Sequence, residues 1–140
     1  MVLVPALLAG CSSGDEKPGA EKARYIEQSD AICRDAFAQA AGIGSGHDEA
    51  TAQKGADVWG AASGKLKALA VPRESEEQAR QFVTDVENLS LAYTAAARGA
   101  NVGNQGRVDK SFTEITDIKK RAAEVADEYG YKVCKNISAT

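Results

Sequence analysis

The sequence has little of the chemistry on which most catalytic and metal sites depend. Its single histidine, His47, belongs to no H-E-x-x-H or E-x-x-H pattern, which excludes a zinc protease site and a di-iron helical bundle. The closely spaced glycines of 42–46 follow no β-strand pattern and match neither the dinucleotide nor the P-loop spacing, so they indicate a linker. We predict no catalytic residue, no metal and no cofactor, and we expect His47 to be an exposed turn residue.

A concentration of charge of one sign is also absent. The 140 residues carry a formal net charge of -3, and acidic and basic residues alternate along the chain. Lys119, Lys120 and Arg121 are consecutive, but adjacent helical positions point to different faces, so these side chains form no compact basic patch. We therefore expect no nucleic-acid partner and no electrostatic attraction to anionic lipid.

No apolar run is long enough to span a bilayer, which needs about 20 residues. The run at 1–10, MVLVPALLAG, ends in small residues before Cys11, and the stretch LAGC at 8–11 resembles the bacterial lipobox. By this resemblance 1–10 is a truncated lipoprotein signal peptide, and Cys11 is the mature N-terminus that carries a diacylglycerol thioether. Because secretory leaders usually have about 15 to 30 residues and open with Lys or Arg, we expect the true start to lie upstream.

The segment 11–20 is small, polar and interrupted by glycine and proline, a composition typical of a flexible tether. A tether suits a lipid anchor at Cys11, since two or more acyl chains hold a protein stably on a membrane. We therefore expect a lipid-anchored protein on the extracytoplasmic face of the cell membrane, with its folded domain at 21–140. The alternative is a buried apolar N-terminal segment that happens to end in a cysteine.

Acylation of Cys11 would leave one pair of cysteines, Cys33 and Cys134, in a compartment where disulfides persist. Their bridge would close a loop of about 100 residues, which the chain-entropy model credits with roughly 4.7 kcal/mol. A redox or metal pair is the alternative, but neither cysteine has a second cysteine or a histidine at ligand spacing. We predict a structural disulfide between Cys33 and Cys134.

Apolar residues recur every three or four positions in four stretches, which predicts four amphipathic helices with short connections. The third stripe leaves Asp85 and Glu87 on its outward side, and Gly130 ends the fourth helix. We predict an all-α, up-down-up-down four-helix bundle in which the first and last helices are neighbours. The tail after Gly130 has to fold back along the first helix to bring Cys134 to Cys33. The predicted helices lie at about 22–41, 47–69, 72–97 and 108–129, with loops at 42–46 and 99–106.

Two residues are candidates for a ligand groove between helices. Trp59 has the chemistry of a binding hot spot, although its place on the second apolar stripe favours a role in the core. Lys119 falls where the fourth stripe needs an apolar residue, so it either snorkels, pairs with an acidic residue or presents a cation inside a groove. The acidic run at 74–77 favours helix-start charge over a weak cation site.

Four stretches give the chain a resemblance to small lipoproteins and secreted proteins of actinobacteria. They are LLAGC before the tether, YIEQSDAICRDAF around Cys33, LKALAVP before the third helix and EYGYKVC near the C-terminus. The resemblance covers the domain loosely, and the lipobox is its most specific part. It implies a helical envelope protein with a disulfide between its end segments, and it implies no activity.

The leading functional hypothesis is a non-enzymatic, membrane-anchored module that binds an envelope protein or a small ligand. Its groove would lie between helices, where the glycines of the second helix carry no side chain and leave room. A second hypothesis is an envelope enzyme or transport accessory protein that uses acidic groups around Lys119 or Glu74. A third is a self-associating surface protein, which requires a large exposed apolar stripe.

Overall fold

The computed structural model describes residue 17 and residues 19–140. The described part is helical and contains no β-strand, which confirms the all-α prediction. None of its helices is both long and apolar enough to cross a membrane. The long helices are α1 (Ala20–Ala40), α2 (Glu49–Lys67), α3 (Glu76–Asn101) and α4 (Gln105–Tyr129), and the short 3₁₀ helices are η1 (Arg73–Ser75) and η2 (Cys134–Ala139).

Side-chain caps and glycines set the helix ends. Asp48 begins α2, and its carboxylate accepts a hydrogen bond from the Thr51 backbone N–H at 2.8 Å. Asn104 does the same for α4, where its side-chain oxygen accepts from the Arg107 N–H at 3.0 Å. Gly130 ends α4 with a φ of 102°, the left-handed conformation that favours glycine.

The predicted loop at 99–106 is wrong in extent, because α3 continues to Asn101 and α4 begins at Gln105. Gly99 lies inside α3, where it faces α4. A Cβ on Gly99 would lie 3.3 Å from the Cβ of Arg107. This glycine therefore serves the close approach of the two helices, and the turn that reverses the chain is confined to 102–104.

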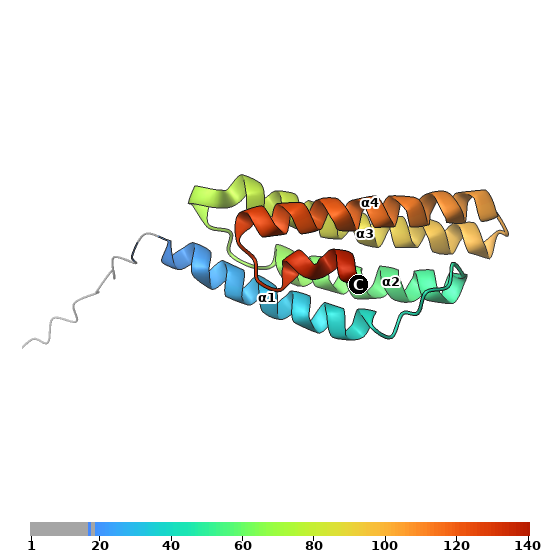
Figure 1. Cartoon of the computed structure of the whole chain (residues 1–140), viewed down its shortest axis with the longest axis horizontal. Coiled ribbons are helices and arrows are strands. Elements are labelled where there is room, and N and C mark those ends of the chain that lie inside the picture. Colours follow the sequence, from blue (N-terminus) through green and yellow to red (C-terminus); the bar gives the residue numbers. More distant parts are fainter. Residues whose placement is uncertain (1–16, 18) are drawn as a thin grey trace, which may run out of the picture.

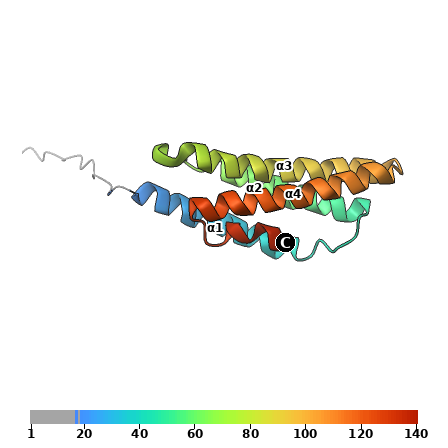
Figure 2. The same ribbon diagram turned by 45° about the horizontal axis from the view of Figure 1, so that its top comes forward.

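Successive long helices run in opposite directions, as expected for an up-down-up-down bundle (Figure 1, Figure 2). α3 packs along α2 and α4, and α1 packs against α2. We expected α1 and α4 to be direct neighbours, but η2 lies between them and packs against both. The two helices themselves meet where Tyr25 packs edge-to-face against Tyr129, with ring centroids 6.1 Å apart.

The C-terminal segment folds back along α1, as predicted, and two contacts hold it there. Cys33 and Cys134 form the predicted disulfide, with Cα atoms 5.2 Å apart. One turn earlier on α1, the buried carboxylate of Asp30 accepts the backbone N–H groups of Lys132, Val133 and Cys134, at 2.8, 2.9 and 2.9 Å. The tail thereby enters the seam between α1 and α4.

The prediction that Asp85 points outward is wrong. Its side chain is buried between α3 and α4, where one carboxylate oxygen pairs with the Arg121 guanidinium at 2.8 Å. The reason is that α3 is covered by α2 on one side and by α4 on the other, so its buried face is wider than one apolar stripe. Glu87 does reach the surface, where it pairs with Lys67.

Candidate functional site

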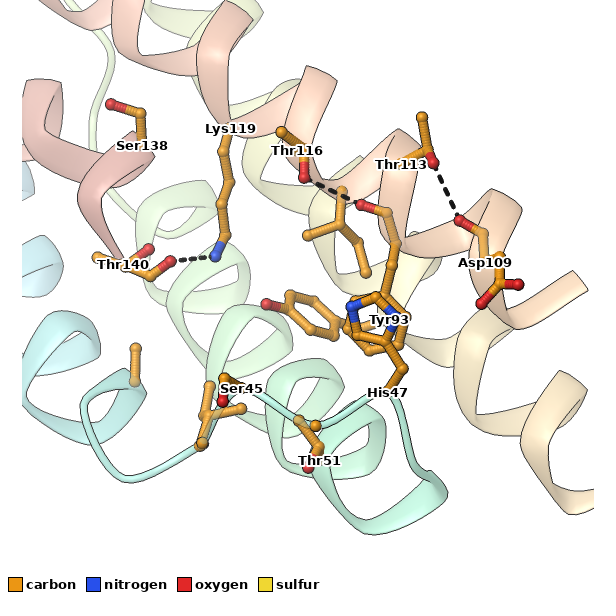
Figure 3. A pocket seen from close by; sticks show the side chains of 16 residues that line it. Ser45, His47, Thr51, Tyr93, Asp109, Thr113, Thr116, Lys119, Ser138 and Thr140 are labelled. Carbon is orange, nitrogen blue, oxygen red and sulfur yellow. Dashed lines mark hydrogen bonds between the residues drawn. The ribbon is translucent and has the colours of Figure 1, made fainter. Parts of the chain in front are cut away.

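A cavity of about 510 Å³ lies towards the end of the bundle where α1 passes into α2. Its walls come from the loop at 43–47, from α3, from α4 and from the C-terminal segment (Figure 3). On α4 the lining residues Phe112, Thr116 and Lys119 are spaced by four and three positions, which places them on one stripe of the helix. Tyr93 of α3 faces this stripe.

The aromatic wall joins the loop to α4. The imidazole of His47 stacks on the ring of Phe112 with centroids 4.0 Å apart and planes within 8°. Tyr93 meets Phe112 edge-on, with centroids 6.1 Å apart. Because Asp48 caps α2, the residue directly before it is held at the start of that helix, where it reaches α4.

His47 is exposed, as the sequence predicted, but its role as part of a wall was missed. The two rings that stack belong to residues far apart in the chain. No local pattern around the glycine-rich loop points to Phe112. The pairing depends on how α4 lies against the start of α2, which only the assembled bundle determines.

Lys119 presents its ammonium to the cavity (Figure 3). Of the three alternatives that the sequence left open for Lys119, this is the cation inside a groove. Its Nζ donates a hydrogen bond to a main-chain oxygen of Thr140 and lies 5.8 Å from the centre of the Tyr93 ring. No carboxylate side chain of the described residues pairs with it. Burial of the half-covered side chain lowers the pKa of Lys119 below its usual value.

Tyr93 supplies a second hydrogen-bond donor. Its ring is buried against α2, where Gly55 makes room for it, because a Cβ on Gly55 would lie 2.3 Å from a ring carbon. The hydroxyl points into the space that the Lys119 ammonium also faces (Figure 3). It has no hydrogen-bond partner among the described side chains, and burial raises the pKa of Tyr93, which keeps the phenol protonated.

The far end of the cavity is acidic. Asp109 lines this end, and it precedes Lys119 on α4. Its carboxylate accepts a hydrogen bond from the Gln105 side chain at 2.8 Å. Ten residues separate Asp109 from Lys119, which corresponds to about 15 Å along α4. The hydroxyl groups of Thr113 and Thr116 lie between these ends and donate to main-chain oxygens of α4.

Trp59 does not line the cavity. It is 1% exposed and packs edge-to-face against Phe37 in the core, with centroids 6.1 Å apart. The structure therefore separates the two residues proposed for a common groove, Trp59 and Lys119. The glycines of α2 do not open a groove either, since Gly55 is filled by the Tyr93 ring.

The other candidates form no catalytic constellation in the described part of the chain. Glu74, Glu76 and Glu77 lie in a shallow surface depression, where Arg80 pairs with Glu76 at 2.6 Å. Within residue 17 and residues 19–140, no group of three or more His, Cys, Asp or Glu side chains could hold a metal ion. Cys11, together with the leader at 1–10 and most of the tether at 11–20, lies outside the described residues.

In the comparisons with known proteins, no family model, no curated protein and no solved structure matches this chain.

Proposed function

We propose that the protein is a non-enzymatic binding module, tethered by a lipid at Cys11 to the extracytoplasmic face of the cell membrane, that takes a small ligand into the cavity between the 43–47 loop and α4. The observation that supports this proposal is the cavity itself. Its volume lies within the range of small-molecule sites, about 300–1,000 Å³, and it combines aromatic surface with donors that face open space.

The spacing of charges favours binding over catalysis. Lys119 and Asp109 are about 15 Å apart along α4, whereas a general acid and a general base that act on one bond both need to be within hydrogen-bond reach of it. The single histidine, His47, is stacked on Phe112. The cavity is therefore better suited to holding a molecule than to transforming one.

The position of the cavity also fits the proposed tether. α1 begins at Ala20, the last residue of the proposed tether, and spans 21 residues, about 30 Å. The loop that closes the cavity follows the opposite end of α1 (Figure 1). A domain attached through its first helix would thus hold the cavity at the end farther from the attachment, where a ligand outside the membrane can enter.

The alternative of self-association has no specific support in the described residues. Their exposed large hydrophobic side chains are Leu91, at 58%, and Val102, at 71%, and these are separated by three turns of α3. Two isolated residues do not form the extended apolar stripe that this hypothesis requires.

A variant that fills the cavity tests the binding proposal. Thr116 is exposed and lines the cavity, so the indole of Thr116→Trp would occupy it, whereas Thr84→Trp places the same side chain on an exposed part of α3 outside it. The full chain with Cys11→Ser is incubated with an envelope extract and examined by native mass spectrometry. We expect a ligand adduct on this protein and on the Thr84→Trp variant, and its loss with Thr116→Trp. An adduct that persists with Thr116→Trp, or no adduct at all, contradicts the proposal.

A further inference from the structure

Resting on the proposed function, we infer that Tyr93 selects the ligand of the cavity, and that this ligand is an uncharged molecule whose carbonyl oxygen accepts a hydrogen bond from the Tyr93 hydroxyl. The ring of Tyr93 holds the donor in place. The hydrocarbon part of the ligand lies against the apolar side chains of Ile43 and Ile115, which line the same cavity.

The Tyr93 hydroxyl is a polar group that the described part of the chain leaves without a partner. The residue is 5% exposed, yet its hydroxyl points into the cavity (Figure 3). By contrast, the lining hydroxyls of Thr113 and Thr116 donate to main-chain oxygens of α4, and Lys119 donates to a main-chain oxygen of Thr140. Because a buried hydroxyl without a hydrogen bond costs free energy, the Tyr93 proton is available to a molecule that enters the cavity.

Two contacts fix the direction of this donor. The ring lies directly against α2, where a Cβ on Gly55 would lie 2.3 Å from a ring carbon. On the α4 side, the ring meets Phe112 with centroids 6.1 Å apart and planes at 87°. The hydroxyl is therefore positioned before a ligand arrives, which lowers the entropic cost of binding.

The lining of the cavity favours an uncharged ligand. Among the described residues, the lysine and the aspartate that line it are Lys119 and Asp109, whose charges are opposite. Lys119 already donates to Thr140, and Asp109 accepts a hydrogen bond from the Gln105 side chain at 2.8 Å. An ion would bring a charge that these side chains do not compensate, whereas a neutral molecule loses less hydration when it enters.

A carbonyl oxygen matches the donor. Burial raises the pKa of Tyr93, so the phenol keeps its proton at neutral pH and can donate it. A carbonyl oxygen has lone pairs and no proton of its own, so it needs no acceptor in return, unlike an alcohol. A ketone or an ester with an apolar body thus fits both the hydroxyl and the apolar part of the wall.

NMR titration of the full chain with Cys11→Ser tests the ligand class, with cyclohexanone as the probe. Methylenecyclohexane has nearly the same shape and no acceptor, and cyclohexanecarboxylate carries a charge. We expect cyclohexanone to shift the amide signals of residues that line the cavity, and each control compound to bind roughly fivefold or more weakly. If either control compound binds as well as cyclohexanone, or if cyclohexanone does not bind, the assignment is wrong.

Matched variants locate the contact. Tyr93→Phe keeps the buried ring and removes the donor, so it should weaken the binding of cyclohexanone roughly fivefold or more. Because the hydroxyl has no partner in the described chain, Tyr93→Phe should leave the Tm unchanged or raise it. An undiminished affinity of the folded variant contradicts the proposal.

Tyr129→Phe is the control for this substitution. The Tyr129 hydroxyl pairs with the Ser75 hydroxyl at 2.8 Å, and neither residue lines the cavity. This variant should therefore lower the Tm and leave the affinity for cyclohexanone unchanged. If Tyr93→Phe lowers the Tm as much as Tyr129→Phe does, the Tyr93 hydroxyl serves the fold and the proposal is wrong.

Selection by Tyr93 and the proposed function fail differently. If Thr116→Trp abolishes the adduct of an envelope component but Tyr93→Phe keeps that adduct at full strength, Tyr93 does not select the ligand and the cavity remains a binding site. If neither the extract nor cyclohexanone yields a complex, both proposals are wrong.

Discussion

At the scale of single residues, buried carboxylates determine where the C-terminal segment and α4 pack in this molecule. Asp30 accepts three backbone N–H groups from the start of the C-terminal segment, and Asp85 pairs with Arg121 across α3 and α4. Hydrogen bonds to a charged acceptor contribute about 1.5–3 kcal/mol each, more than bonds between neutral groups. A few carboxylates thus fix how the tail and the last helix are placed.

Removal of the Asp30 carboxylate should therefore release the tail. We expect Asp30→Ala to lower the free energy of unfolding by about 3 kcal/mol, because three N–H groups lose their acceptor. Asp35→Ala, at an exposed position of the same helix, should change it by no more than about 0.5 kcal/mol. Urea unfolding measures both, and similar losses for the two variants would refute a special role for Asp30.

The tyrosines predict the dependence of stability on alkaline pH. Burial raises the pKa of Tyr25, Tyr93, Tyr129 and Tyr131 above the ordinary value of 10.0. The unfolded chain therefore releases these protons at a lower pH than the folded chain, and stability should fall as the pH rises past about 10. The lowered pKa of Lys119 acts in the opposite direction below that pH, since the unfolded chain there binds more protons.

Ultraviolet absorbance of the phenolate measures this effect. The four tyrosines should ionise together with the loss of helical circular dichroism as the pH is raised. Lys119→Met serves as the control for the opposing group and should leave the alkaline transition in place. If the tyrosines ionise near pH 10 while the helices remain intact, their hydroxyl groups are accessible to water in the folded protein and this prediction is wrong.

At the scale of helices, glycines in α2 have two different roles. Gly55 lies against the Tyr93 ring, and a Cβ there would lie 2.3 Å from a ring carbon. Gly64 is exposed, and a Cβ there would meet nothing within 4 Å. The same residue type thus permits close packing at one position and only weakens the helix at the other.

These two glycines give opposite predictions for one substitution. Gly55→Ala should destabilise the protein by about 2 kcal/mol, because the methyl group forces the ring of Tyr93 to move. Gly64→Ala should stabilise it by up to about 1 kcal/mol, since alanine is the better helix former. Thermal or urea unfolding of the two variants measures both changes. A stabilising effect of Gly55→Ala would show that α2 and α3 are farther apart at this position than the structure places them.

The helices could be predicted from the sequence because each has a local pattern of apolar residues and helix-end residues. The spacing of apolar residues located all four, Asp48 and Gly130 indicated helix ends, and the pairing of Cys33 with Cys134 followed from the count of cysteines. The loop at 99–106 was misjudged, because a glycine that faces another helix is indistinguishable in sequence from one that ends a helix.

The site was less predictable, because its parts meet only in the assembled bundle. Lys119 could be singled out as a charge on an apolar stripe, and it does line the cavity. The stack of His47 on Phe112 and the open hydroxyl of Tyr93 depend on helix packing, for which no local pattern exists. Trp59 was a groove candidate by residue type, but its place on the second apolar stripe favoured the core, where it packs against Phe37 of α1.

At the scale of the whole molecule, the proposal joins two features at opposite ends of α1. α1 begins at Ala20, the last residue of the proposed tether, and its other end leads into α2 (Figure 2). The cavity is lined by residues of that connection. The disulfide and the Asp30 contacts bind the C-terminal segment to α1, so this segment contributes Thr140 to the cavity wall. The crosslink thus helps to build the site. Disulfides generally persist in compartments where thiols are oxidised, which agrees with the proposed location outside the cytoplasm.

The intact mass of the native protein, extracted from membranes, tests this arrangement most directly. We expect a chain that begins at Cys11, carries the mass of its acyl groups, and lacks the two hydrogens lost on forming the bridge between Cys33 and Cys134. Cys11→Ser should move the protein out of the membrane fraction. A soluble product with an unmodified thiol at Cys11 and two reduced cysteines would contradict the account.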